Sequence, residues 1–332
     1  MLMMSQTDIM TNNMTDRCTE DFKHVDGVMK VLELVFYIPI FVVGLILNIA
    51  ALVVFCGLLR KKTESTIYMI NLALMDLILL LILPFKMHAT NHEWPANFHE
   101  LCSILEGLYF YGIYGSIYII MCIAVDRWVA ICHPFKAKQL RSPRVTMVIC
   151  VVVWMLVSGS VIPVIWNFRN TKNGTFHCFH QFSAEGWKPP IIISVQVFGF
   201  VLPALVVVLC SVQIIWTLQQ SGQHSPQSRA CVKIIYSGLC AFLVPFTPSH
   251  LAIFLQFLVH QGAFQDCGTK ANLSLFIQIA MCLSNITCCL DAMCYYFIAH
   301  EVRNTRHSFR MSIMSQRRPT NSTSERERGE SS

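Results

Sequence analysis

The sequence predicts an all-α membrane protein, a seven-transmembrane helical bundle followed by a short cytoplasmic amphipathic helix. Hydrophobic residues make up 54% of the 332 residues and charged residues only 13%, whereas soluble domains carry about 25% charged residues. So few charges cannot cover the surface of a soluble protein of this length. The mean hydropathy of +0.52 therefore indicates a chain whose surface lies mostly against lipid.

A bilayer core about 30 Å thick needs roughly 20 apolar residues per helix, and seven runs of the sequence meet this requirement. Basic or acidic residues bound most of these runs, and a helix is the form that satisfies the backbone of each in lipid. The expected spans are residues 31–59, 67–87, 100–131, 145–166, 191–218, 234–259 and 273–297. The bundle, residues 31–297, would then lie between a polar extracellular amino terminus, 1–30, and a cytoplasmic helix with a disordered tail, 298–332.

The boundaries follow the chain in order. The first span ends at Arg60-Lys61-Lys62, the second ends at Lys86 and His88, and the third runs from Glu100 past Asp126-Arg127. Each of the last four spans follows a basic residue: Arg144, Lys188, Lys233 and Lys270 in turn.

The distribution of basic residues predicts the orientation. Most of the 25 Lys and Arg residues lie after spans one, three, five and seven, and such loops face the cytoplasm. The amino terminus is then extracellular in a plasma-membrane protein, and Asn13 and Asn173 lie in outer glycosylation sequons. The net charge of +6 belongs to the inner face, where it attracts anionic membrane lipid, and we expect no nucleic-acid partner.

Four cysteines lie on the outer side in this topology: Cys18, Cys102, Cys178 and Cys267. An even number there suits disulfides. A Cys102–Cys178 pair would fix the loop between spans four and five over the mouth of the bundle. A Cys18–Cys267 pair would tie the amino terminus to the last outer loop.

Ionisable side chains within a span are costly unless they face a cavity or a partner. Asp76 lies in the middle of span two and Asp291 in the inner half of span seven, with Ser116 in the middle of span three. These groups would either share a monovalent cation such as sodium or form hydrogen bonds between helices. A channel or transporter that uses the two carboxylates along an ion path is an alternative from a different class.

A second polar group lies near the outer ends of the spans, where Lys86 and Glu106 have similar depth. The lysine would meet a phosphate or carboxylate, and apolar walls would accept an acyl chain. The alternative is a Lys86–Glu106 salt bridge that only closes the bundle. The other residues at heights suited to this ligand pocket are Tyr109, Phe110, Phe200, His250, Gln256, Gln278 and Met281.

Several motifs resemble the rhodopsin-like (class A) G-protein-coupled receptors over residues 31–303. They occur in the order of that family: Asn48 in GLILN, Asp76 in NLALMD, Cys102, Asp126-Arg127-Trp128, Trp154, Pro203 and Phe246-Thr247-Pro248. The resemblance implies that Asp126 and Arg127 couple to a heterotrimeric G protein and that Phe246, Pro248 and Tyr295 form the switch. It also implies the Cys102–Cys178 disulfide and an allosteric sodium ion at Asp76, Ser116 and Asp291.

The chain departs from that pattern at several positions. Span seven reads Asp291-Ala-Met-Cys-Tyr295 without the usual proline, so the bend there is open. Amine receptors carry an aspartate where this chain has Tyr109, which argues against an amine ligand. The sequence has neither an HExxH nor a Gly-x-Ser-x-Gly motif, so we expect no enzyme, no catalytic residue and no required cofactor.

Within the family, TIYMINLALMDL, LPFKM, LRSPR, FLQFLV and SNITCCLDAMCYYF resemble lysophospholipid-responsive members. That resemblance implies an anionic lysophospholipid ligand, in particular lysophosphatidylinositol, with Lys86 meeting its phosphate. It also implies G12/13 and Gq signalling to Rho and calcium, and arrestin binding through the tail. A nucleotide or a small carboxylate such as kynurenate is the alternative, because one lysine can serve any anion.

Overall fold

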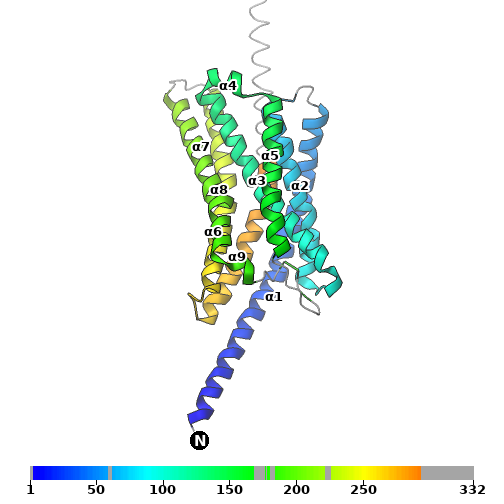
Figure 1. Ribbon diagram of the computed structural model, residues 1–332, viewed down its shortest axis with the longest axis vertical. Coiled ribbons are helices and arrows are strands. Elements are labelled where there is room, and N and C mark those ends of the chain that lie inside the picture. The colour runs from blue at the N-terminus through cyan, green and yellow to red at the C-terminus, as the bar shows by residue number, and fades with distance from the viewer. Residues whose placement is uncertain are drawn as a thin grey trace, which may run out of the picture.

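The computed structural model describes residues 3–58, 62–167, 176, 178–179, 184–220 and 226–292. Seven helices in this part of the chain are long and apolar enough to cross a membrane, and they form one bundle (Figure 1). The prediction of an all-α bundle of seven spans is confirmed. We call the end at which α1 begins the outer end of the bundle, and the end that carries α4 the inner end.

The spans are built from these elements. They are α1 (Met3–Leu52) with the π-helical turn η1 (Val53–Leu58), α2 (Glu64–Asn91), α3 (His99–Cys132), α5 (Pro143–Asn167), then α6 (Pro189–Gln196), the π-helical turn η4 (Val197–Val201) and α7 (Leu202–Gln220) as one span, α8 (Pro226–His260), and α9 (Cys267–Asn285). Three short helices connect them: η2 (Ala96–Phe98), α4 (Pro134–Leu140) and η3 (Ala184–Trp187).

Helix α1 begins well before the predicted span. The helix begins at Met3 and projects beyond the outer end of the bundle (Figure 1). The predicted boundary at residue 31 marks where the apolar run starts. The helix itself extends further because no proline interrupts residues 3–30.

The side chains of Asn48 and Trp154 hold the spans in register. Asn48 Nδ2 donates hydrogen bonds to the carbonyl oxygens of Gly44, at 3.0 Å, and Cys288, at 2.9 Å. This joins α1 to the seventh span. Trp154 Nε1 donates to Asn71 Oδ1 at 3.0 Å and joins α5 to α2. Both Asn48 and Trp154 belong to the sequence motifs, and each satisfies a polar group that lipid could not.

The fifth and seventh spans are not regular helices. The π-helical turn η4 ends just before Pro203, which has no N–H to donate. Helix α9 ends at Asn285, Ile286 forms a turn, and residues 287–292 are helical again. The hydroxyls of Ser284 and Thr287 donate to the carbonyls of Met281 and Ser284, and such side-chain bonds compete with the helix ladder. The seventh span is thus interrupted without a proline.

Two contacts tie the loop between spans four and five to the outer end of the bundle. Cys102 and Cys178 form the predicted disulfide, and Trp94 and Phe176 exchange backbone hydrogen bonds of 2.8 and 2.9 Å. Cys267 is also disulfide-bonded. The side chains of Cys18 and Asn13 lie outside the described residues, as do Asn173, Tyr295 and the predicted helix and tail after residue 297.

Candidate functional site

Lys86 forms the centre of a buried cluster near the outer end of the bundle. Its side chain comes from α2 and is 8% exposed. The Nζ atom lies 3.3 Å from the hydroxyl of Tyr109 and over two rings, 4.4 Å from the centroid of Tyr109 and 5.4 Å from that of Tyr37. Cations are held in this way by ring faces. The Tyr109 hydroxyl also receives a hydrogen bond from Asn285 Nδ2 at 3.3 Å, so four spans meet at this cluster.

Glu33 belongs to the same cluster and was not found from the sequence. It lies on α1 and is 4% exposed, and its Oε2 accepts a hydrogen bond from the hydroxyl of Thr90. Met29, Glu33 and Tyr37 recur every four residues and are all buried. That spacing places them on one helix face and is the signal that identifies Glu33 as an interior residue.

Glu106 is hydrogen-bonded to the outer loop that carries Cys178. Its Oε1 accepts a hydrogen bond of 2.9 Å from the backbone N–H of Phe179 and so anchors the loop that follows Cys178. Among the described residues, neither Lys86 nor Glu106 takes part in an ion pair, so a direct Lys86–Glu106 salt bridge is not formed. Glu106 also lies beside Cys102 and Cys178, but their disulfide leaves no thiolate to bind a metal.

A small cavity lies deeper in the bundle, between α3, α8 and the seventh span. Its walls are mostly apolar. The lining residues are Phe110, Ile113, Tyr114, Phe246, Ser249, His250, Ile253, Met281 and Ser284.

His250 is the main polar group of this cavity. Its ring is stacked on Phe200 at 4.5 Å, and its Nδ1 lies 2.9 Å from the carbonyl of Phe246. The other ring nitrogen, Nε2, is buried without a hydrogen-bond partner. Since a buried polar atom normally has a partner, Nε2 is available to a ligand.

The structure thus divides the predicted ligand residues into two neighbouring groups. Lys86 and Tyr109 lie in the buried cluster, whereas Phe110, His250 and Met281 line the cavity and Phe200 supports it. Asn285 joins the two groups, because it follows the cavity residue Ser284 and contacts Tyr109. Gln256 and Gln278 are not among the residues that line this cavity.

The predicted sodium residues are brought together in the middle of the bundle. Ser116 Oγ donates to Asp76 Oδ1 at 3.2 Å, and Asp76 and Asp291 interact electrostatically. Both aspartates are buried, and the Oδ2 atom of each has no hydrogen-bond partner. Two carboxylate oxygens without partners fit a hard monovalent cation, because such ions prefer oxygen ligands.

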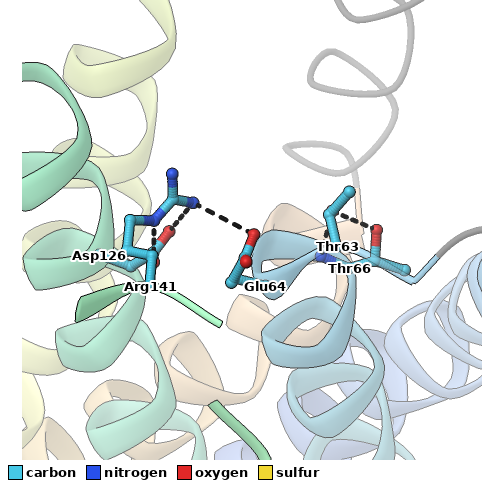
Figure 2. A network of polar contacts seen from close by, with 5 residues as sticks. All are labelled: Thr63, Glu64, Thr66, Asp126 and Arg141. Atoms are coloured by element: carbon cyan, nitrogen blue, oxygen red, sulfur yellow. Dashed lines mark hydrogen bonds and ion pairs between the residues drawn. The ribbon is translucent and has the colours of Figure 1, made fainter. Parts of the chain in front are cut away.

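At the inner end, Asp126 is paired with Arg141 (Figure 2). The guanidinium donates two hydrogen bonds, of 2.7 and 2.9 Å, to the two carboxylate oxygens, which is the bidentate form of this contact. It also lies 3.8 Å from Glu64 at the start of α2. Burial alone would lower the pKa of Arg141, but the hydrogen bonds and charge of Asp126 outweigh this effect and raise it.

This network joins the inner ends of α2 and α3 to the segment before α5. Thr63 caps α2 by accepting a hydrogen bond from the Thr66 N–H at 3.3 Å, as Figure 2 also shows. Trp128, two residues beyond Asp126, donates to Gln213 on α7. Arg127 lies between Asp126 and Trp128 at this end and is half-buried.

Seven spans form the bundle, and a disulfide joins the third span to an outer loop. Together with a small interior cavity and the Asp126-Arg127 sequence at the inner end of α3, they define a receptor of the seven-transmembrane class. The chain belongs to the 7 transmembrane receptor (rhodopsin family), whose family model matches residues 47–295. Members of this family are multi-pass plasma-membrane receptors that act through heterotrimeric G proteins, and they are not enzymes.

Several curated receptors are similar to this chain. The human G-protein coupled receptor 55 is 40% identical over 289 residues, which cover 85% of this chain and 89% of the relative. The human lysophosphatidic acid receptor 4 is 34% identical and covers 79% and 72%. The mouse G-protein coupled receptor 35 is 34% identical and covers 78% and 82%.

Proposed function

We propose that this receptor responds to an anionic lysophospholipid, in particular lysophosphatidylinositol, and that Lys86 meets the phosphate of the ligand. The observation that carries the proposal is the buried lysine in the outer half of α2. It is held by ring faces and a phenol, and it has no direct ion pair with any of the described residues. Two of the relatives, receptors 4 and 6, are named as lysophosphatidic acid receptors, which supports a ligand of this chemical class.

The two groups of ligand residues suit the two parts of such a lipid. Lys86 suits the head group, and the apolar cavity beneath it suits the start of the acyl chain. The space in it that a water-sized molecule can reach is about 10 Å³, far below the ~300–1,000 Å³ of pockets for drug-sized ligands. A lipid must therefore displace Tyr109 from Lys86 and widen this cavity.

Such a displacement connects ligand binding to the switch residues. Phe246 lines the cavity and packs on Phe242, and Pro248 follows two residues later on α8. A ligand that contacts Phe246 differently in two arrangements of α8 shifts the balance between them. In the proposal, the shifted state exposes Arg127 to a G protein of the G12/13 or Gq class, which signals to Rho and calcium, and the tail binds arrestin.

The sodium ion remains part of the proposal. The residues that would hold it are Asp76, Ser116 and Asp291, and the ion would neutralise the two carboxylates in the middle of the bundle. We further propose that the amino terminus is extracellular and that Asn13 and Asn173 are glycosylated.

The alternative ligand is a nucleotide or a small carboxylate such as kynurenate. One observation favours it: the cavity is small as it stands, and a compact anion would need less widening than a lipid. Lys86 would meet the anion in either case.

The experiment is a ligand panel in cells that express the full chain. Lysophosphatidylinositol, lysophosphatidic acid, a nucleotide and kynurenate are compared with Rho-dependent and calcium readouts. The proposal predicts a response to the inositol lipid in both readouts and its loss in Arg127→Ala at equal surface expression. A response confined to the nucleotide or kynurenate would replace the lipid proposal, and silence to all four would contradict both ligand assignments.

A further inference from the structure

Glu33 is a buried carboxylate for which the proposed function has no use so far. Its neighbours on α1, Val31 and Val35, are 63% and 60% exposed to the surroundings of the bundle, whereas Glu33 is 4% exposed. A carboxyl group on the interior face of a span is expensive to bury, and such residues are functional candidates. The question is which charge or ligand it faces.

Its contacts place it beside Lys86. The hydroxyl of Thr90 donates to Glu33 and lies 3.0 Å from the carbonyl oxygen of Lys86, one helical turn earlier on α2. Tyr37, one turn further along α1 than Glu33, presents its ring to the Lys86 ammonium. Glu33 and Lys86 also attract each other electrostatically. The carboxylate is therefore an internal counter-charge of the ammonium, and Thr90 connects Glu33 to the backbone of Lys86.

This arrangement has a consequence for any phosphate that binds Lys86. The phosphate gains attraction from the ammonium and suffers repulsion from Glu33, and the repulsion grows with the charge of the phosphate in a medium of low dielectric. A phosphate monoester carries about −1.5 to −2 charges at neutral pH, whereas a diester carries one. Sugar hydroxyls on a diester can also donate hydrogen bonds to a carboxylate.

We propose that Glu33 sets the head-group selectivity of the Lys86 site by disfavouring phosphate monoesters and accepting phosphate diesters that carry hydroxyl groups. The proposal rests on the proposed function, because it concerns the same site and the same class of lipid. It distinguishes lysophosphatidylinositol, a diester, from lysophosphatidic acid, a monoester.

The test uses the full-length receptor and these two lipids with the same acyl chain. Potency is measured for the wild type, for Glu33→Gln and for Glu33→Met, at matched surface expression. Removal of the charge is expected to raise the potency of the monoester about tenfold or more relative to the diester. Two variants are used because the apolar replacement, Glu33→Met, is expected to fold even if the amide, Glu33→Gln, does not. A potency ratio from one well-expressed variant is enough to test the proposal.

Asp26→Asn is the matched control, since Asp26 lies on the same helix and is exposed. It should leave the ratio of potencies as in the wild type. An unchanged ratio in the Glu33 variants, with both lipids still active, overturns the role of Glu33 and leaves the proposed function standing. A wild type that responds to neither lipid overturns the proposed function and this inference together.

Discussion

At the scale of single residues, the pairing of Asp126 with Arg141 decides how the charges at the inner end are arranged. Asp126 is 8% exposed and accepts both of its strong hydrogen bonds from a residue that lies outside α3. A nearly buried carboxylate depends on such a partner, because without one it retains the cost of its lost hydration. Arg141 is therefore a structural anchor for the inner end of α3.

Replacement of Arg141 by Gln is expected to destabilise the receptor by about 1–3 kcal/mol, the usual cost of a buried polar group left without its partner. The measurement is thermal unfolding of the purified receptor. Arg144→Gln removes the same charge from an exposed position near the start of α5 and should change the unfolding temperature little. Equal unfolding temperatures for the two variants would show that the Asp126–Arg141 pair has no structural role.

The sodium site is a second prediction at this scale. The wild type should unfold at a higher temperature in sodium chloride than in choline chloride of the same ionic strength, because an ion that binds only the folded state stabilises it. Asp76→Asn should abolish the difference between the two salts, since it removes one of the two carboxylates. A wild type that unfolds at the same temperature in both salts would rule out sodium binding.

At the scale of helices, the contact between α2 and α3 is set by a glycine. A Cβ atom on Gly112 would lie 3.0 Å from Leu79 Cβ and 3.2 Å from the Met75 carbonyl oxygen. The second neighbour is backbone and cannot rotate away. The close approach of these helices positions Lys86, Tyr109 and Ser116, so the site depends on this glycine.

Gly112→Ala is accordingly expected to destabilise the bundle by about 1–3 kcal/mol, the typical cost of overpacking. Gly159→Ala is the control, because it adds the same methyl group to another span where nothing lies within 4 Å. Thermal unfolding of both variants provides the comparison. If Gly112→Ala is as stable as Gly159→Ala, then α2 and α3 have room to separate and the packing argument is wrong.

Helix boundaries also show where sequence reasoning succeeds. The spans are predictable because the apolar runs are long and are bounded by charges, as at Lys62 before α2 and Arg144 near the start of α5. The interruption at Ile286 is not predictable from a missing proline, since hydroxyl and amide bonds to nearby carbonyls produce it. The full length of α1 could not be predicted, because its first part is polar and lacks the apolar run that marks a membrane span.

At the scale of the whole molecule, the candidate site combines residues from spans that are distant in sequence. The intramembrane charges Lys86, Asp76 and Asp291 are visible in the sequence because charges there are rare. The partners of these charges cannot be read from the sequence, because they depend on the direction of each side chain and on the contacts between helices. Glu33 was missed because it lies near the edge of the predicted span, and its burial depends on α2.

The central claim of the account is that Lys86 recognises the phosphate of an anionic lysophospholipid. The most direct measurement is the binding of labelled lysophosphatidylinositol to membranes that contain wild-type receptor, Lys86→Gln or Lys30→Gln, the last as an exposed lysine of α1. The account predicts that Lys86→Gln weakens binding at least about thirtyfold, as expected when a buried charge partner is lost, and that Lys30→Gln has little effect. Equal affinity for wild type and Lys86→Gln would contradict the claim.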